Sequence, residues 1–502
     1  MSNQAGEESR GRTAGDAGGV LASHAVAIGL RYLGAVFIAR ALTLEDFGRF
    51  TLALTLVSVA GIVAVMGVSP GMLPFLARAR RGGRLEDLRA VVRGSLSIIL
   101  IASIAVALAI VIGAGPVSEW VFDDRLVGGP LVALAPFVVA TALLTWSTTL
   151  VQGLASARQQ AFLARVVVGS ISIVGFALTW ALGLGLTGVT TTMVAAPLVS
   201  IVLALRLVAQ RAPGALALSG GTGERVTRSL FRESWPLMGV STFAFVLGWM
   251  DVLMMGAFRG SDEVGVYGAC VRLAIAVMVV HEAAGPVFMA RLSHLFVDRD
   301  WPRIRELYRT TCLWSLWSGV TIAAVLIVWG RELLGVFGPE YAAGAAALAV
   351  LAAARGASSI GGMCGRMLAI TGRARLNLIN QTLLIAINGG LGLLWIPRHG
   401  ALGAAAGTLI SVATINLLQT VQVWLLYRVQ PYTWRSAAAI AWTAATGMLA
   451  WQVREGLGGA LGWTLPLALF LAASGGFYLA VGVGEEERAF VRLLRARAPW
   501  AR

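Results

Sequence analysis

Long apolar runs separated by short polar segments make up the chain from Val20 to Val483. Each run extends over roughly 20 residues, the length that an α-helix needs to cross a bilayer core about 30 Å thick. The runs do not alternate between apolar and polar residues, and they are much longer than a barrel strand, so helices are the spanning form that fits them. The pattern therefore predicts an all-α integral membrane protein with about 14 transmembrane helices. Their centres are expected near residues 30, 60, 102, 138, 172, 197, 246, 274, 320, 354, 386, 412, 444 and 472.

The charged residues support this class and orient the chain. Only 13% of the 502 residues are charged, against about a quarter in an average soluble domain. All 40 basic residues are arginines, and with the N-terminus placed in the cytoplasm 30 of them fall in the tails and loops of that side and 7 in the opposite loops. Because cytoplasmic loops carry the positive excess, we expect a multi-pass protein of the cytoplasmic (inner) membrane with both termini in the cytoplasm.

The net charge of +15 is mostly this topology signal, and it also suits contact with anionic lipid head groups. No nucleic acid partner is expected. Cys270, Cys312 and Cys364 fall in or beside apolar runs without metal-ligand spacing, so they are expected to be small core hydrophobes rather than disulfides or ligands. The sequence shows no glycine-rich phosphate loop, so no ATP-driven step is expected, and no cofactor is expected either. No removable signal peptide is expected.

A short loop of the first half of the chain recurs in the second half. The segments "LEDFGRF" (44–50) and "DEVGVY" (262–267) share two acids, a hydrophobe, a glycine and an aromatic residue at an offset of 217. Further matches follow in the same order while the offset drifts from 217 to 215, as small insertions and deletions would produce. The matched pairs are Gly48 and Gly265, Pro70 and Pro286, Arg89 and Arg305, Arg93 and Arg309, Phe122 and Phe337, Arg158 and Arg373, Gly175 and Gly390, Trp180 and Trp395, Gly185 and Gly400, and Gly188 and Gly403.

The co-linear matches predict two copies of one six-helix unit, made by helices 1–6 and 7–12, with helices 13–14 appended. Six is an even number, so both copies enter the membrane from the same side and form parallel repeats. The loop recurs because it is the same outer turn after the first helix of each copy. The predicted divisions are a disordered cytoplasmic tail (1–19), an N-terminal six-helix lobe (20–208), a cytoplasmic linker (209–232), a C-terminal six-helix lobe (233–428), helices 13–14 (429–484) and a basic cytoplasmic tail (485–502).

Several stretches resemble the polysaccharide (O-antigen-type) flippases. These are "IARALTLEDFGRFTLALTL", "GVSPGMLPFLAR", "VQGLASARQQ" and "GALGAAAGTLIS". That family belongs to the multidrug/oligosaccharidyl-lipid/polysaccharide exporter superfamily, and the resemblance covers essentially residues 20–480. It implies two six-helix lobes around a central cavity, alternating access, and 14 helices in the branches that carry lipid substrates.

Three ionisable residues within the apolar runs are the main candidates for a substrate site. Counted from the outer loops, Arg31, Asp251 and Arg272 each lie about 10–14 Å below the outer face, in one layer. Buried charges in a bilayer usually face a cavity or a partner. We expect Arg31 and Arg272 to donate to a diphosphate and Asp251 to orient them. The alternative is a structural ion pair between Asp251 and one arginine.

Three further ionisable residues have two readings each. Arg355, within the tenth run, is either a third phosphate or sugar contact or a donor to carbonyls freed beside the glycine-rich "RGASSIGGMCG". His281 and Glu282 are adjacent, but neighbouring helical residues point about 100° apart and need not touch. Either is a candidate for carrying a coupling proton. The alternative is that both lie at a helix end, solvated or hydrogen bonded.

The function predicted from these features is transport of a polyprenyl-diphosphate-linked oligosaccharide across the membrane. A lipid II-type precursor flippase shares the diphosphate and stays an alternative. A cation-coupled multidrug exporter would need a surplus of acids, whereas arginines exceed acids in this layer. A membrane glycosyltransferase or ligase would need a sizeable outer domain, and the predicted outer loops have about 5–15 residues, so an enzyme is not expected. Polysaccharide polymerase and assembly proteins are candidate partners.

Overall fold

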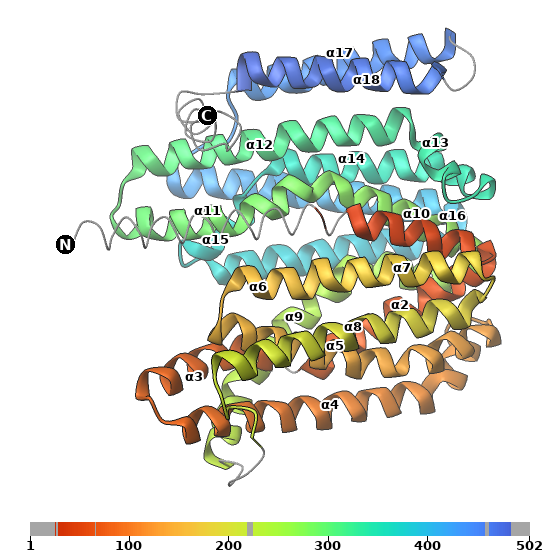
Figure 1. Ribbon diagram of the computed structural model, residues 1–502. Helices are drawn as coiled ribbons and strands as arrows, with labels where there is room; N and C mark the ends of the chain where they lie inside the picture. The colour runs from red at the N-terminus through yellow and green to blue at the C-terminus, as the bar shows by residue number, and fades with distance from the viewer. Residues whose placement is uncertain (1–25, 27–28, 66, 218–223, 457–460, 483–502) are drawn as a thin grey trace, which may run out of the picture. The chain divides into compact units, whose positions relative to one another are not determined.

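The computed structural model describes residues 26, 29–65, 67–217, 224–456 and 461–482. All regular secondary structure in these ranges is helical (Figure 1). The predicted tails, 1–19 and 485–502, lie outside the described residues. After a first helical segment at 29–41, the elements are α2 (Leu44–Val65), α3 (Val68–Gly82), α4 (Leu85–Trp120), η1 (Arg125–Val127), α5 (Gly128–Leu154), α6 (Ala157–Ala161), η2 (Phe162–Val167), α7 (Val168–Ala181), α8 (Gly185–Arg211), α9 (Glu224–Phe258), α10 (Ser261–Ala274), η3 (Ile275–Met278), α11 (Val279–Val297), α12 (Trp301–Val328), α13 (Gly330–Gly335), η4 (Pro339–Gly344), α14 (Ala345–Gly361), α15 (Cys364–Ile370), α16 (Ala374–Tyr427), α17 (Trp434–Gly456), α18 (Leu461–Phe477) and η5 (Tyr478–Gly482).

The helices coincide with the apolar runs. Each of the 14 predicted centres falls on a helical residue, and 10 helices in the described ranges are long and apolar enough to cross a membrane. The longest candidate, Arg375–Tyr427, contains two predicted centres, with Gly400 as a non-helical residue between them. The all-α integral membrane class is thus confirmed, whereas the number 14 stays a prediction.

The described chain forms two compact units, and neither is one continuous stretch. Unit 1 contains the described residues up to Arg272 together with Val336–Tyr341 and Gly389–Ala404. Unit 2 contains Leu273–Gly335, Ala342–Asn388 and the described residues from Ala405 onward. The lobe boundaries predicted at 208 and 233 stay a prediction.

Unit 1 has a tightly packed interior and also apolar side chains that are exposed on its surface. Trp146 of α5 is 4% exposed, and its indole nitrogen donates to the hydroxyl of Ser95 on α4 at 2.9 Å, so the buried polar atom is satisfied. By contrast α4 exposes Ile101 and Ile112 at 71% and 78%. Lipid tails are as apolar as these side chains, so close packing rather than burial from water holds such helices together. The exposed face of α4 is therefore expected to contact lipid.

The backbone repeats where the sequence repeats. Gly185 and Gly400, a matched pair, have φ angles of 56° and 53° and begin corresponding turns. This left-handed region favours glycine because it carries no Cβ. Three residues on, Gly188 faces Leu184 and Gly403 faces His399 in the same way. The repeat is therefore visible in local conformation as well as in sequence.

The two copies of the repeated outer turn pack against each other within unit 1. A Cβ on Gly48 of α2 would collide with the carbonyl oxygen of Ser261, at the start of α10. A Cβ on Gly265 of α10 would lie 2.6 Å from the carbonyl oxygen of Leu44, at the start of α2. An offset of 217 converts each contact into the other. This reciprocal contact has the form of a two-fold interface, and it is the physical reason why both turns need glycine.

In unit 2 the α16 hairpin is held by paired amides. Asn380 and Gln422 exchange two hydrogen bonds of 2.7 and 3.0 Å, and Gln419 donates to Asn377 at 3.2 Å. Both pairs join residues about 20 positions before and after Gly400, so the chain folds back there. Elsewhere in the described chain, Cys270, Cys312 and Cys364 are buried and form no disulfide with one another.

Candidate substrate site

Arg272 is a buried cation on α10 whose guanidinium is incompletely paired. Its Cζ lies 4.8 Å from the centre of the Phe47 ring, and its Nη2 donates to the hydroxyl of Thr51 at 3.2 Å. Its Nη1 is buried and has no hydrogen-bond partner among the described residues. Phe47 and Thr51 lie four residues apart on α2, one helical turn, so they form one face under the guanidinium. Arg272 is thus a buried cation with one donor that has no partner among the described residues.

Asp251 of α9 is 7% exposed and is held by Tyr267 of α10. The tyrosine hydroxyl donates to Asp251 Oδ2 at 2.6 Å, and the backbone N–H of Val252 donates to Oδ1 at 2.9 Å. Tyr267 precedes Arg272 by five residues on the same helix. Asp251 therefore fixes the part of α10 that carries Arg272, through a tyrosine that the sequence analysis did not single out.

Arg31 lies in the helical segment 29–41 and its side chain is exposed. Arg165 of η2 lies near enough for its charge to act on Arg31. The sequence analysis had assigned Arg165 to a loop, but it falls within the candidate span Ala157–Ala181. Two neighbouring guanidinium groups repel each other and favour an anion between them.

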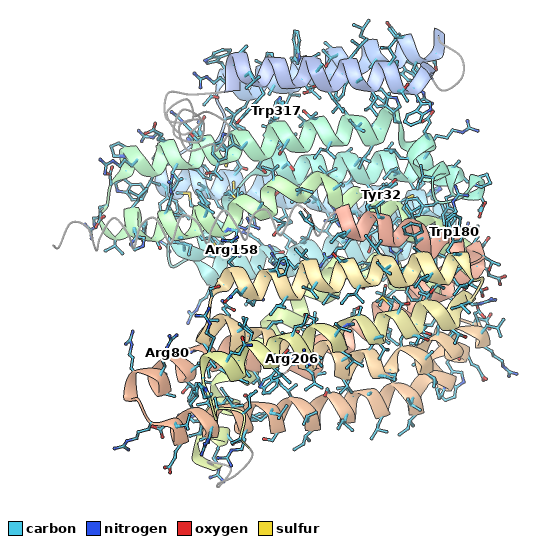
Figure 2. The ribbon with its side chains drawn as sticks, viewed as in Figure 1. Tyr32, Arg80, Arg158, Trp180, Arg206 and Trp317 are labelled. Carbon is cyan, nitrogen blue, oxygen red and sulfur yellow. The ribbon has the colours of Figure 1, made fainter. Side chains whose placement is uncertain are left out.

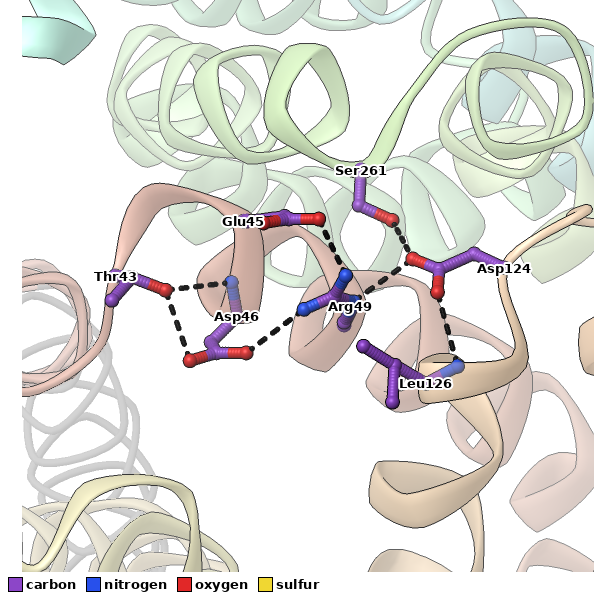
Figure 3. Close-up of polar contacts among 7 residues, drawn as sticks. All are labelled: Thr43, Glu45, Asp46, Arg49, Asp124, Leu126 and Ser261. Atoms are coloured by element: carbon purple, nitrogen blue, oxygen red, sulfur yellow. Dashed lines mark hydrogen bonds and ion pairs between the residues drawn. The ribbon is translucent and has the colours of Figure 1, made fainter.

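One end of unit 1 contains a cluster around Arg49, whose side chain is 12% exposed (Figure 3). Its guanidinium contacts three carboxylates, those of Glu45 at 2.5 Å, Asp46 at 3.2 Å and Asp124 at 2.9 Å. Asp124 also accepts hydrogen bonds from Ser261 at 2.8 Å and from the backbone N–H of Leu126 at 3.0 Å. We call Glu45, Asp46, Arg49, Asp124 and Ser261 the Arg49 cluster, which joins elements of both copies.

The carboxylate of Asp124 has opposing influences on its pKa. Partial burial acts to raise it, but the hydrogen bonds from Arg49, Ser261 and the Leu126 amide favour the charged form. Together they hold the pKa of Asp124 below its ordinary value. Asp124 is therefore ionised at neutral pH, and it pairs with Arg49 as a carboxylate.

Arginines also lie at the other end of the helices of unit 1. In Figure 2, Arg80 and Arg158 lie at one end of the helices of unit 1 and Trp180 lies near the other end. Arg80 extends to the carbonyl of Gly153 at 3.5 Å, and Arg158 is exposed.

In unit 2, His281 and Glu282 of α11 point to different partners. The ring of His281 is buried, and its Nδ1 lies 2.9 Å from the hydroxyl of Ser315 on α12. Glu282 forms an ion pair of 2.9 Å with Arg366 of α15, and the same guanidinium donates to the backbone carbonyl of His281 at 2.9 Å. Gly285 leaves the space that Arg366 occupies. Arg366 therefore contacts both residues, through the His281 backbone and the Glu282 side chain.

Arg355 of α14, also in unit 2, is half-buried. Its Nε is buried without a hydrogen-bond partner among the described residues. Its backbone carbonyl accepts from the hydroxyl of Ser359 at 3.3 Å. Like Arg272, it keeps an unused charged donor within a helix.

The structure places each predicted site residue and adds partners that the sequence analysis missed. Asp251 of α9 contacts Tyr267 on α10, the helix that also carries Arg272. The charge of Arg165 acts on Arg31. Phe47 was present in the repeated motif, so its aromatic ring was a usable signal, whereas the partnership of Arg366 with Glu282 spans 84 positions and left none. Within the described residues, no group of three or more His, Cys, Asp or Glu side chains could hold a metal.

Fold and site together define a multi-pass helical membrane protein with unpaired arginines inside its spanning helices. The chain belongs to the polysaccharide biosynthesis protein family, whose pattern it matches over residues 16–288, more than half of its length.

Known proteins with the same fold include flippases and exporters. The chain is 24% identical over 192 residues to a protein from Haloferax volcanii described as a probable low-salt glycan biosynthesis flippase, Agl15. That match covers 38% of this chain and 41% of the relative, so the chain spans less than half the length of the curated relative it matches. Among solved structures, it resembles the lipid II flippase MurJ in an inward closed conformation, with a TM-score of 0.69, 12% identity, and 91% of this chain and 96% of that one covered. An inward-facing multidrug resistance MATE family transporter gives a TM-score of 0.66, 14% identity, and 82% and 95% coverage.

Proposed function

We propose that this protein moves a polyprenyl-diphosphate-linked oligosaccharide, the repeat unit of a surface polysaccharide, across the cytoplasmic membrane by alternating access. The observation that carries the proposal is Arg272, a buried guanidinium with an unused Nη1 donor inside a spanning helix. A diphosphate presents several acceptor oxygens, and a guanidinium binds such groups in fork geometry. The family description and the name of the Haloferax relative support a glycan as the cargo.

In this proposal the other candidate residues assist Arg272. Arg31 and Arg165 attract the anionic substrate, and Arg355 supplies a further phosphate or sugar contact. Asp251 holds Tyr267 and so positions α10. The lipid tail of the substrate stays in the bilayer, because nothing polar is needed to solvate it.

The Arg49 cluster acts as a closure of the outer side. Its hydrogen bonds from Arg49 and Ser261 to Asp124 connect elements from both copies of the repeat. Alternating access requires that the outer turns separate, so these bonds must break for the substrate to leave outward. With both termini in the cytoplasm, the cluster faces the outer leaflet.

Energy coupling is assigned to the His281–Glu282–Arg366 group. Protonation of Glu282 would release Arg366, and the freed guanidinium would then change its hold on the His281 carbonyl. A transport rate that does not depend on the proton gradient would contradict this assignment.

Two other functions compete with the proposed one. A lipid II-type precursor shares the diphosphate anchor and would occupy the same arginines, and the MurJ fold suits it. A cation-coupled drug exporter would need a surplus of buried acids, whereas Asp251 is already bound by Tyr267 and the added residue of the site, Arg165, is again basic. An enzyme is not proposed.

The deciding experiment measures lipid-linked glycans in cells that lack this protein. Accumulation of one polyprenyl-diphosphate-oligosaccharide is expected, and its mass identifies the cargo. Complementation with the full chain should clear the pool, complementation with Arg272→Ala should not, and Arg125→Ala, an exposed arginine at 82%, is the matched control. An unchanged pool together with new sensitivity to cationic compounds would support the exporter instead.

A further inference from the structure

Unit 2 has a groove at the arginine-rich side of the predicted topology, between the first turns of α12 and the segment that enters α17. Its volume is about 350 Å³. Its walls are Pro302, Arg305, Glu306, Arg309, Thr310, Leu313, Thr433, Trp434 and Arg435. Three arginines against one glutamate leave the groove positive, and none of these four charged side chains belongs to an ion pair in the described part of the chain.

One polar side chain of the groove is fixed by a hydrogen bond, and another has no hydrogen-bond partner within the described ranges. Arg309 Nε donates to the backbone carbonyl of Gln430 at 3.4 Å, which ties its guanidinium to the segment before α17. The hydroxyl of Thr433 is buried and has no hydrogen-bond partner among the described residues. A buried hydroxyl without a partner is unfavourable, so an acceptor oxygen of a ligand in the groove would satisfy it.

The groove continues into an apolar surface. Leu313 and Arg435 also line a narrow second pocket, together with Trp317, Ala439, Phe477, Tyr478 and Val481. Trp317 (Figure 2) stacks on Tyr478, with ring centres 4.4 Å apart. Arg435 therefore lies at the border between a cationic groove and an aromatic, apolar wall formed by α12, α17 and η5.

The position of the groove along the helices places it at the edge of the hydrocarbon core. Arg309 precedes the predicted centre of its span, near residue 320, by 11 residues, and Arg435 precedes that of its own span, near residue 444, by 9. At 1.5 Å per residue these arginines lie about 14–17 Å from the midplane, where lipid phosphates begin. Trp434 is 70% exposed beside them, as expected of an interfacial tryptophan.

We propose that this groove binds an anionic glycerophospholipid of the bilayer. Arg305, Arg309 and Arg435 hold its phosphate, the hydroxyl of Thr433 donates to a phosphate oxygen, and the acyl chains lie along Trp317 and Phe477. Basic pockets between helices on the cytoplasmic side suit this class of ligand. A soluble phosphate would not use the apolar wall, and a neutral lipid would not use three arginines. The site belongs to unit 2, uses none of the residues assigned to the cargo, and does not depend on the proposed cargo.

The first copy of the repeat shows why the site belongs to the second copy. Arg89 and Arg93 are the counterparts of Arg305 and Arg309. In the first copy Arg89 Nε donates to the carbonyl of Gly214 at 2.8 Å, whereas in the second copy the donor to the matching carbonyl, that of Gln430, is Arg309. Trp434, Arg435, Phe477 and Tyr478 have no counterpart in that copy, because they come from the appended elements α17, α18 and η5. The appended pair therefore converts a repeated arginine face into a lipid site.

The test is native mass spectrometry and thermal stability of the full chain, purified in a neutral detergent and titrated with phosphatidylglycerol or phosphatidylcholine. Phosphatidylglycerol should bind at one saturable site and raise the Tm, and phosphatidylcholine should not. Arg305→Gln combined with Arg435→Gln should weaken the phosphatidylglycerol affinity at least tenfold. Arg303→Gln, on the same helix but outside the groove and 76% exposed, is the matched control and should bind normally.

Additional arms separate the possible sources of the phosphate. Equal binding of both lipids, or an equal loss in Arg303→Gln, would overturn the proposal. Binding of glycerol phosphate as tightly as the lipid would show that the apolar wall contributes nothing. Displacement by a polyprenyl diphosphate at equal concentration would assign the groove to the transported substrate instead. If the double variant unfolds, Arg305→Lys with Arg435→Lys keeps the charge and should retain most of the binding.

Discussion

Arg49 and Arg272 of unit 1 differ in how their guanidinium groups are paired. They lie on α2 and α10, the corresponding helices of the two copies. Arg49 contacts three carboxylates, whereas Arg272 contacts an aromatic ring and a hydroxyl and keeps Nη1 unpaired. A guanidinium whose donors are all paired holds several elements together. A buried guanidinium with an unpaired donor is unfavourable for folding, and binding of an anion would relieve that cost.

The energies point to different roles for the two residues. A hydrogen bond to a charged group contributes about 1.5–3 kcal/mol, and a buried donor without a partner costs a similar amount. Removing Arg49 leaves carboxylates without their cation, so stability should fall. Removing Arg272 also removes an unpaired charged donor, so stability should change little or rise. Binding, not folding, should be what Arg272 contributes.

The largest effect is expected at the glycine beside Arg49. In Gly48→Ala the new Cβ collides with the carbonyl oxygen of Ser261, and a backbone atom at the start of a helix cannot give way as a flexible side chain would. The amount of folded protein after membrane extraction should fall severalfold. Gly113→Ala on α4 adds a Cβ into open space and serves as the control. Normal yield of Gly48→Ala would mean that the two outer turns do not touch as described.

Arg272→Ala should abolish most transport while leaving the fold intact. Loss of one or two charged hydrogen bonds to the diphosphate corresponds to roughly a 10- to 100-fold fall in transport. The Tm of the purified variant should be unchanged or higher, and Arg272→Lys should restore part of the rate. The measurements are clearance of lipid-linked glycan and Tm on the same preparation. Full transport by Arg272→Ala at normal protein levels would remove it from the substrate site.

Arg49→Ala should show the reverse pattern, a clear loss of stability. About 1–3 kcal/mol is expected from the unpaired carboxylates, equivalent to a fall in Tm of roughly 2–5 °C. Arg125→Ala removes an exposed arginine paired with Glu119 at 3.1 Å and should lower the Tm far less. Equal effects of the two variants would show that the Arg49 cluster is an ordinary surface ion pair.

The smallest effect concerns the pH dependence of the Arg49 cluster. The pKa of Asp124 is lower in the folded protein than its ordinary value of 3.8. Its contribution is therefore fully present above the unfolded pKa and is lost as the pH falls through the folded pKa. The difference in Tm between the wild type and Asp124→Asn should shrink as the pH is lowered from about 5 to about 3. A constant difference would mean that the charge of Asp124 contributes nothing.

The helices could be predicted from the sequence because run length alone identifies a spanning segment. The repeat was also visible, since Gly48 and Gly265 must both lack a Cβ. The site was predictable only in part: an arginine within an apolar run marks Arg272, but no local pattern shows that the Phe47 ring lies beneath it. Tyr267 and Arg366 reach their acids across helix contacts, which depend on packing and not on spacing.

The discontinuity of the two units has a consequence for biosynthesis. Unit 1 is completed by Val336–Tyr341 and Gly389–Ala404, and these late segments receive bonds from early residues: Arg40 donates to the Val336 carbonyl at 2.9 Å, and Arg259 to that of Pro397 at 3.3 Å. A ribosome must therefore insert the chain past residue 404 before unit 1 can mature. Until then part of the packing surface of the early helices stays exposed in the membrane. Chaperones and quality-control proteases would act on the chain during this interval.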